Sequence, residues 1–406
     1  MRRAVVGVLV FVIAGAWSSA AGAVPVPSQD PFYDVPPNIS GLPNGTVLAS
    51  RPVEVNAYSI PMPVHAWQVK YKTTGDRDVA SADVATIMVP DVPWTGKGPR
   101  PLVSYQTAED GISTQCSPSY GLRAGLTDDE NNSGSETGLM EYALLQGWAV
   151  VAPDYEGPDS LFLDPAVQAH GVLDGIRAVL HFAPDRLGQK TPLGIWGYSG
   201  GSVASDEAAQ AQPAYAPSLH FKGIALGGLV GSVMATLNDF SGGPAGGAIV
   251  MGFAAVNRDY PAADVLQYLN PAGRTAVAEA QNDCLTQAAA QFPFASMTEY
   301  EAYPDIESTP AVVNLFDRIS PLDLPGTPTA PIYDYHSSYD ELAPLGPDRA
   351  QMRRFCAAGV KVDHVETALG EHVGAAVTGA PGAVAYLAAR FAGRPAPDNC
   401  GSIPAS

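Results

Sequence analysis

The sequence predicts an α/β fold with a mostly parallel central sheet, flanking helices and an inserted, mainly helical segment. Short apolar strands alternate with helical stretches along most of the chain, as parallel βαβ units require. This alternation breaks between Leu229 and roughly Ala330, where helical patterns continue but strand signals are few. The chain has 406 residues, of which 46% are hydrophobic, so it can form one large α/β domain with such an insertion.

Charge and composition exclude several classes of protein. Lys and Arg total 22 and Asp and Glu total 41, which gives a formal net charge of −19. Phosphate backbones repel such a chain, so we expect no nucleic-acid partner. Anionic lipid surfaces repel it too, so any lipid contact must be mainly hydrophobic. The large hydrophobic fraction, with only 16% charged residues, excludes disorder and coiled coil.

The N-terminus has the pattern of a secretory signal peptide. Arg2 and Arg3 precede the apolar run Ala4–Trp17, and small residues follow up to Ala21-Gly22-Ala23. An uncleaved anchor is less favoured because the apolar run is short for a bilayer span. The pattern predicts cleavage near Ala23, a mature chain from residue 24, and secretion.

All four cysteines lie in the part of the chain that would be exported, where disulfides are expected. They are Cys116, Cys284, Cys356 and Cys400. Four cysteines allow three pairings, and their spacing does not choose among them. Because no C-x-x-C pair is present, we expect no metal site, and nothing in the sequence calls for a cofactor.

The first core part, residues 24–228, begins with an arm and continues with strands. Residues 24–63 are rich in Pro, Gly, Asn and Ser, which predicts an extended arm on the surface. Helices are expected at Met140–Gln146, at 166–183 and from Ser202 onward. The expected strands are Trp67–Lys72, Ala85–Pro90, Pro101–Tyr105, Ala149–Ala152, Leu193–Trp196 and Phe221–Leu226.

The second core part, residues 331–406, follows the insertion and ends in a tail. Strands are expected at Pro331–Tyr335 and Lys361–Glu366, and a helix at Ala383–Phe391. The insertion, residues 229–330, is called the cap segment below. It contains the glycine-rich apolar run Phe240–Met251, which we expect to be flexible and to lie over the sheet.

A G-x-S-x-G motif, Gly197-Tyr198-Ser199-Gly200-Gly201, follows a predicted strand and precedes a predicted helix. A tight strand-to-helix turn strains the serine backbone and leaves no room for neighbouring side chains, which explains the glycines. The turn exposes the hydroxyl at the carboxyl edge of the sheet and places a helix N-terminus beside it. The motif therefore predicts Ser199 as a nucleophile; an ordinary glycine-rich turn is the alternative.

A serine nucleophile needs a histidine base, and four histidines follow Ser199. His372 lies in a predicted loop after the last strand, where the base is expected. His364 falls inside that strand, so we expect it to be packed in the fold or to lie at the edge of the sheet. His336 ends the preceding strand, and His220 is expected at the surface. The sequence therefore favours His372.

The orienting acid is predicted to be Asp340, in a turn after the strand that ends near His336. Asp334 lies within that strand and should point elsewhere, whereas Glu341 remains a second choice. Asp340 as a simple helix cap is the other alternative. The order serine, aspartate, histidine is that of α/β-hydrolases.

An oxyanion donor is expected from the stretch Tyr105–Gly111, in addition to the N–H of Gly200. An ionised Asp110 carboxylate would oppose catalysis there, so either a protonated carboxyl or the main-chain N–H of Asp110 must serve.

Two other acidic stretches are assigned structural roles. The stretch Asp128–Gly134 does not match the EF-hand pattern, so we expect a solvated loop there. The stretch Asp154–Gly157 is expected to form a turn, and the alternative for it is that it lines the pocket.

Taken together, these motifs resemble the secretory lipase family, the α/β-hydrolases similar to yeast lipase A. The matching stretches spread over residues 100–400. They are Val103-Ser104-Tyr105 with Glu109-Asp110, Cys116–Tyr120, Asp154 with Glu156-Gly157, Leu173–Ala178, Gly197–Gly201, Gly242-Gly243-Pro244, Asp340 with Pro344, and Glu371-His372.

The resemblance implies a triad of Ser199, Asp340 and His372 and an oxyanion hole at Asp110 and Gly200. It also implies a helical cap or lid from about Leu229 and two disulfides, Cys116–Cys284 and Cys356–Cys400. The first disulfide would tie the cap segment to the sheet domain, and the second would hold the C-terminal tail.

The implied activity is that of a secreted serine carboxylester hydrolase, without metal or cofactor, acting on triacylglycerols or related lipid esters through an acyl-enzyme on Ser199. The apolar cap segment would contact lipid surfaces transiently. Two alternatives remain: a secreted serine peptidase on the same fold and a non-catalytic lipid-binding module. Many family residues of the cap segment are replaced by Ala, which leaves the acyl-chain preference open.

Overall fold

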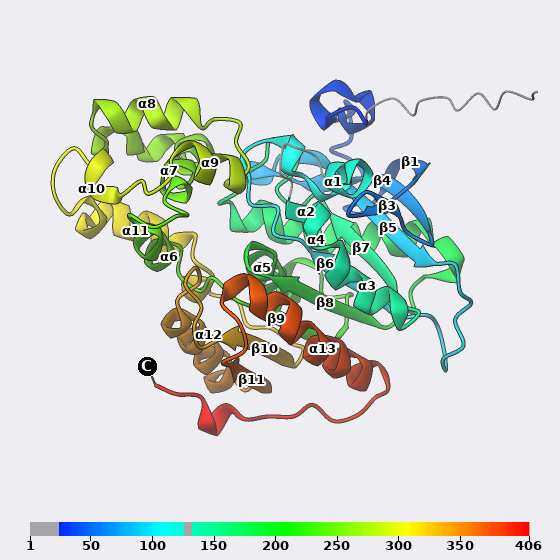
Figure 1. The fold of residues 1–406 in the computed structure, drawn as a ribbon. Helices are drawn as coiled ribbons and strands as arrows, with labels where there is room; N and C mark the ends of the chain where they lie inside the picture. The colour runs from blue at the N-terminus through cyan, green and yellow to red at the C-terminus, as the bar shows by residue number, and fades with distance from the viewer. Residues whose placement is uncertain (1–23, 126–131, 406) are drawn as a thin grey trace, which may run out of the picture.

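A nine-stranded sheet forms the centre of the molecule in a computed structural model that describes residues 24–125 and 132–405 (Figure 1). The predicted signal peptide, residues 1–23, and residues 126–131, which include most of the predicted acidic loop, lie outside the described residues. The last three residues of that loop, 132–134, begin a short helix instead. The strand order is β1-β4-β5-β7-β6-β8-β9-β10-β11. The strands are β1 (Val47–Val53), β4 (Val64–Thr74), β5 (Ala80–Pro90), β6 (Leu102–Gln106), β7 (Ala149–Pro153), β8 (Leu193–Tyr198), β9 (Phe221–Gly227), β10 (Ile332–Ser337) and β11 (Val362–Thr367).

The strands from β7 to β11 run parallel, whereas β1, β4 and β5 add an antiparallel edge. Every residue of β6, β7 and β8 is buried because helices cover both faces of the sheet. This arrangement confirms the predicted α/β-hydrolase fold class. A separate two-stranded ribbon, β2 (Asn56–Ala57) with β3 (Ile60–Pro61), lies in the N-terminal part.

Two hydrophobic clusters, one on each face, hold the helices against the sheet. On one face α4 (Pro165–Phe182), α5 (Gly200–Tyr215) and α12 (Leu345–Ala357) contribute apolar side chains. The opposite face is covered by α1 (Pro118–Ala124), α3 (Thr137–Leu145) and α13 (His372–Phe391), beside the short α2 (Asn132–Ser135). The parallel strands therefore lie between two helical layers, with their carboxyl ends at one edge.

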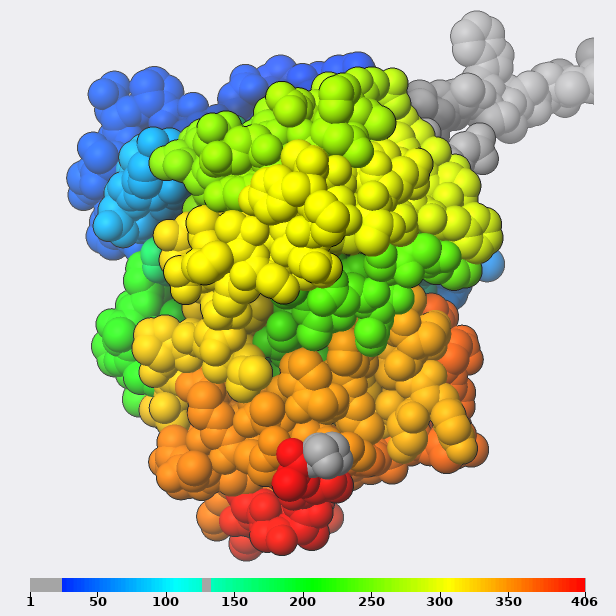
Figure 2. Space-filling model, turned by 90° about the vertical axis from the view of Figure 1, so that its left-hand side faces the viewer, coloured from blue at the N-terminus to red at the C-terminus, as the bar shows by residue number. Residues whose placement is uncertain are grey.

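The cap segment joins β9 to β10 and has a hydrophobic cluster of its own. Figure 1 shows its helices gathered beside one end of the sheet, and Figure 2 shows them as a continuous yellow-green surface between the N-terminal and C-terminal parts. No helix of the described residues is long and apolar enough to cross a membrane. The helices of the cap segment are α6 (Val233–Phe240), α7 (Gly247–Asp259), α8 (Pro271–Glu279), α9 (Leu285–Gln291), α10 (Met297–Tyr300) and α11 (Pro310–Arg318).

Two local predictions were wrong. Residues 24–63 do not form only an extended arm, because β1 within them joins the main sheet. The strand β1 contains Pro52, which has no N–H to donate; an edge strand tolerates a proline whose nitrogen faces away from the neighbouring strand. The run Phe240–Met251 is not flexible throughout, since it becomes the buried helix α7 from Gly247 onward. A Cβ atom at Gly247 would lie 2.0 Å from the carbonyl oxygen of Ala288, so this glycine permits close packing against α9.

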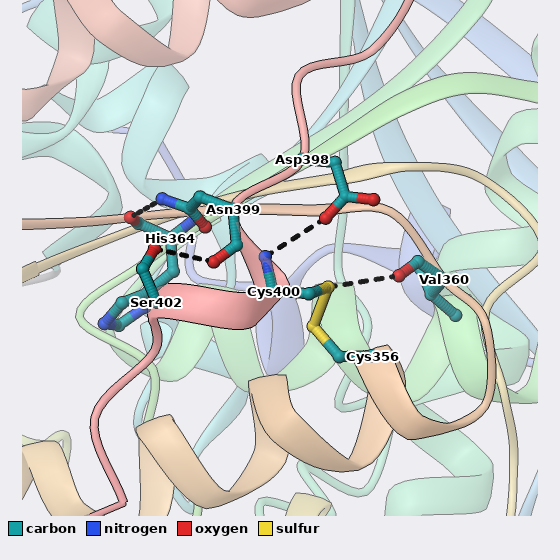
Figure 3. The surroundings of a disulfide bond; sticks show 7 residues. All are labelled: Cys356, Val360, His364, Asp398, Asn399, Cys400 and Ser402. Atoms are coloured by element: carbon teal, nitrogen blue, oxygen red, sulfur yellow. Dashed lines mark hydrogen bonds between the residues drawn. A yellow bond between two sulfur atoms is a disulfide. The ribbon is translucent and has the colours of Figure 1, made fainter.

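Two disulfides link distant parts of the chain, Cys116 to Cys284 and Cys356 to Cys400. Figure 3 shows the second, which fastens the C-terminal tail to α12. Beside it, the side chain of Asn399 donates to the carbonyl of His364 at 2.7 Å and accepts from its N–H at 2.9 Å. The tail thereby satisfies backbone groups of β11, the edge strand, that would otherwise be open to pairing.

Candidate active site

Ser199 occupies the turn between β8 and α5 in a strained backbone conformation, with φ 53° and ψ −127°. Its N–H donates to the carbonyl of Gly227 at 2.9 Å, which holds the turn against the next strand. The motif glycines are needed for close backbone approach. A Cβ atom at Gly197 would lie 2.1 Å from the carbonyl oxygen of Gly201, and one at Gly201 would lie 2.0 Å from that of Gln106. These contacts give the G-x-S-x-G pattern a physical reason.

The Nε2 atom of His372 lies 2.8 Å from the Ser199 hydroxyl oxygen. His372 is the first residue of α13, so its predicted position in a loop before a later helix was wrong. The helix continues through Pro381, a residue that ordinarily breaks a helix. Glu371 caps the helix by accepting from the N–H of Gly374 at 3.1 Å, and this fixes where the imidazole stands.

The carboxylate of Asp340 lies 2.7 Å from Nδ1 of His372, through Oδ2. Its other oxygen accepts from the N–H groups of Leu342 at 3.0 Å and Ala343 at 2.7 Å. Burial alone would raise the pKa of Asp340, but the hydrogen bond and charge of His372 and the Ala343 N–H bring it below its ordinary value. Glu341, the second choice, contacts only the main chain of His372, accepting from its N–H at 3.0 Å.

A second histidine stands behind Asp340, and the sequence analysis missed this contact. The Nε2 atom of His336 lies 2.9 Å from the carbonyl oxygen of Ala343 and 3.4 Å from Oδ2 of Asp340. Its Nδ1 atom lies 3.3 Å from a carboxylate oxygen of Asp348. Burial opposes protonation of His336, but Asp348 and its neighbours raise the pKa to about 9. The spacing His336-x-x-x-Asp340 across a turn was the available signal.

Among the described residues, one group offers ligand atoms close enough to hold a metal: Asp334, Asp348 and His364, within 4.8 Å of one another. In the structure His364 bonds to the carboxylate of Asp334 through Nδ1 and lies 3.0 Å from Glu366 through Nε2. Glu366 in turn pairs with Arg349. These contacts make an ion-pair network behind Asp340, as expected for packed residues.

On the other side of Ser199, the residues predicted for the oxyanion hole meet. Among the described residues, neither the main-chain N–H of Asp110 nor that of Gly200 donates a hydrogen bond. A Cβ atom at Gly200 would lie 1.8 Å from a carboxyl oxygen of Asp110, so glycine lets the two approach. Burial raises the pKa of Asp110 to about 6, an effect that the positive charge of His372 partly offsets.

The loop that carries Asp110 is held by the cap segment. Leu285 donates its N–H to the carbonyl of Asp110 at 2.9 Å, and Gly111 pairs with Cys284 in an isolated bridge. The disulfide from Cys284 to Cys116 reinforces this junction. The two cysteines of this junction are 168 residues apart in sequence, so local sequence patterns gave no sign that the two segments meet.

A cavity of about 350 Å³ opens beside Ser199, His372 and Asp110. This volume lies within the range of roughly 300–1,000 Å³ for small-molecule sites, and the lining is mostly apolar. A larger cavity of about 640 Å³ lies against the N-terminal arm and contains none of these residues. The cap segment contributes Val233, Leu237, Phe240, Met251, Leu285 and Ile319 to the lining near Ser199.

A family model described as Secretory lipase matches residues 129–399. The chain belongs to the secretory lipase family. This secretory lipase is 34% identical over 383 residues to Lipase A of Arthroderma benhamiae, covering 90% of this chain and 80% of that one. It is 35% identical over 379 residues to a Mycobacterium tuberculosis protein named "Probable inactive lipase MT1628", covering 92% and 84%.

Among solved structures, the secretory lipase is similar to Candida antarctica lipase A, with a TM-score of 0.84 and 27% identity. The match covers 94% of this chain and 89% of that one. Family membership and the shared fold make the protein a carboxylic ester hydrolase of the lipase type, with lipid esters as its substrate class. The family description also indicates secretion, as the N-terminal sequence predicts.

Proposed function

We propose that Ser199, His372 and Asp340 are the catalytic triad of a secreted lipase that hydrolyses triacylglycerols or related lipid esters. One observation carries the proposal. An unbroken hydrogen-bonded chain runs from the Ser199 hydroxyl through both nitrogens of His372 to the Asp340 carboxylate, at the wall of an apolar cavity. Because one relative is named as probably inactive, this intact geometry matters more than family membership alone.

In the proposed reaction, the Ser199 oxygen attacks the ester carbonyl carbon while Nε2 of His372 accepts the hydroxyl proton. The tetrahedral intermediate collapses, His372 returns the proton to the leaving alcohol, and the acyl group stays on Ser199. Water, deprotonated by His372, then attacks the acyl carbon, and His372 returns the proton to the Ser199 oxygen as the fatty acid leaves. Asp340 orients the imidazole and stabilises its charged form throughout.

The free N–H groups of Asp110 and Gly200 are the proposed donors to the oxyanion. In enzymes of this type, removal of one such donor lowers kcat by about 10²–10³. The strained turn at Ser199 places the Gly200 N–H at the start of α5, where the helix dipole also favours a negative charge.

The proposed substrate places its acyl chain in the apolar cavity between α5 and the cap segment, residues 229–330. We propose that this segment acts as a lid that contacts lipid surfaces transiently, and that signal-peptide cleavage occurs near Ala23. The buried position of α7 supports a motion of the cap segment as a whole over a motion of the run Phe240–Met251 alone. An apolar lining suits a fatty-acyl chain better than a peptide, so the lipase is favoured over the peptidase.

Hydrolysis of 4-nitrophenyl decanoate and labelling by a fluorophosphonate probe test the triad directly. In Ser199→Ala we expect both to disappear, with hydrolysis falling by several powers of ten while the protein remains folded. The matched control is Ser218→Ala, at an exposed serine after α5, which should keep full activity.

Three other outcomes would contradict the proposal. Retained labelling in Ser199→Ala would place the nucleophile elsewhere. A folded wild-type protein without labelling or hydrolysis would be a binding module. Cleavage of a peptide anilide in preference to the ester would identify a peptidase.

A further inference from the structure

The apolar cavity beside Ser199 contains polar side chains that the protein itself leaves without partners. Glu207 is only 3% exposed and Thr236 only 6% exposed, and both line the cavity. Within the described residues, Oε2 of Glu207 and the hydroxyl of Thr236 have no hydrogen-bond partner. Buried polar groups are normally hydrogen-bonded because an unmade bond destabilises the fold, so these two groups require an explanation.

Glu207 lies where the far part of a bound acyl chain would reach, and Thr236 lines the same cavity. Ser199, Val203 and Glu207 follow one another at four-residue spacing along α5, and all three line the cavity. At 1.5 Å per residue, Glu207 stands roughly 12 Å along the helix from the ester position. Thr236 faces the same cavity from α6 in the cap segment. Glu207 is therefore distal to Ser199, with the apolar Val203 between them, whereas Glu156, another unpartnered carboxyl of the lining, follows β7 instead.

The charge around the cavity favours a neutral ligand group. No Lys or Arg of the described residues lines the cavity, so no cation there neutralises Glu207. Burial, and next the nearby charge of Asp206, raise the pKa of Glu207 well above its ordinary value. A protonated carboxyl can both donate and accept a hydrogen bond, as a hydroxyl group can. A carboxylate-bearing chain would find no countercharge.

We propose that this secretory lipase prefers esters whose acyl chain carries a hydroxyl group at its distal end, with Glu207 and Thr236 as the residues that recognise it. The inference rests on the proposed function, because the acyl chain must be attached to Ser199 to reach them. The hydroxyl completes the hydrogen bonding of Glu207 and Thr236, whereas a plain alkyl chain leaves them unpaired. A binding site with buried polar groups discriminates against a ligand that lacks the matching polar group, because those buried groups then stay unpaired.

The test compares kcat/KM for 4-nitrophenyl decanoate and 4-nitrophenyl 10-hydroxydecanoate. Wild type should prefer the hydroxylated ester. In Glu207→Leu the ratio of hydroxylated to plain ester should fall about tenfold, the effect of one buried hydrogen bond, while plain-ester hydrolysis persists. Thr236→Val, which keeps the side-chain shape, should also lower the ratio. Glu207→Gln, which can still donate and accept, should retain the preference.

The matched control is Glu279→Leu, at an exposed position of α8 outside the cavity, which should leave the ratio unchanged. Two outcomes would overturn the inference while leaving the lipase proposal intact. In the first, wild type prefers the plain ester; in the second, the ratio of hydroxylated to plain ester is the same in wild type, Glu207→Leu and Thr236→Val. Hydrolysis of neither ester would overturn the proposed function and this inference with it.

Discussion

At the scale of single residues, the proposed oxyanion hole depends on the close approach of the Asp110 carboxyl to Gly200. Asp110 has φ 39°, a conformation that few side chains adopt, and its carboxyl lies against Gly200. The same loop also presents the free N–H of Asp110. An ionised carboxylate at this place would repel a developing oxyanion, whereas a protonated one would stabilise it.

This balance predicts a pH-dependent effect of Asp110→Asn. The pKa of Asp110 is raised to about 6, so its carboxyl loses its proton as the pH rises through that value. The asparagine amide keeps the shape and the donor at every pH. We expect the ratio of variant to wild-type kcat/KM to rise about tenfold between pH 5 and pH 8, less than the factor of about 10²–10³ for loss of a whole oxyanion donor.

Use of this ratio removes any effect of pH on kcat/KM that the two proteins share. Asn suits the left-handed backbone, and circular dichroism would check that the variant folds. A ratio that stays constant with pH would show that Asp110 contributes through its main chain alone.

At the scale of elements, the cap segment and the sheet domain are joined close to the loop that carries Asp110. The Cys116–Cys284 disulfide closes a sequence separation of 168 residues, and Leu285 holds the carbonyl of Asp110. The Cys356–Cys400 disulfide closes a separation of only 44 residues and fastens the tail far from Ser199 in sequence. The two crosslinks should therefore differ in their effect on catalysis.

Removal of the first disulfide, in Cys116→Ala with Cys284→Ala, should lower the free energy of unfolding by about 2–5 kcal/mol. It should also lower kcat, because the Asp110 loop loses its anchor. Urea unfolding and ester hydrolysis would measure the two effects. Cys356→Ala with Cys400→Ala is the matched control, expected to lower stability while kcat stays near wild type. Equal losses of kcat in the two double variants would contradict this role of the first crosslink.

At the scale of the whole molecule, several buried acids and a buried histidine favour a stability that falls as the pH rises. Burial raises the pKa of Glu136 to about 8, against the lowering effect of its hydrogen bonds with Tyr105 and Ala108. Asp206 is raised to about 7, also by burial. Burial opposes protonation of His364, but Asp334 raises its pKa to about 9. Each of these groups binds its proton more tightly in the folded protein than in the unfolded chain.

The sign follows from linkage: a folded protein that binds more protons than the unfolded chain loses stability as the pH rises. For Glu136 the loss runs from its ordinary value of 4.5 up to about 8, and for His364 from 6.5 up to about 9. Glu366, with a pKa lowered to about 2 chiefly by Arg349, acts oppositely but only in strong acid. We therefore expect a higher melting temperature at pH 5.5 than at pH 9.

Scanning calorimetry at several pH values would test this expectation. Glu136→Gln, which removes one titrating group but keeps its shape, should make the decline with pH shallower. A melting temperature that is constant or rises from pH 5.5 to pH 9 would refute it.

The sequence by itself determined the α/β fold and drew attention to Ser199, because these depend on local patterns: alternating strands and helices, and glycines at a tight turn. The order of the chain singled out Asp340 and His372. Only the tertiary structure decided that their side chains meet, that α13 begins at His372 despite Pro381, and that β1 joins the sheet.

Contacts between residues distant along the chain leave no local pattern in the sequence, so the remaining contacts of the site could not be predicted from it. The His336 contact with Asp340, the hold of Leu285 on Asp110, and the shared cavity of Glu207 and Thr236 each depend on packing between separate elements. A single sequence records which side chains can pack or hydrogen-bond. Which of them actually do so is decided by the free energy of the whole folded chain.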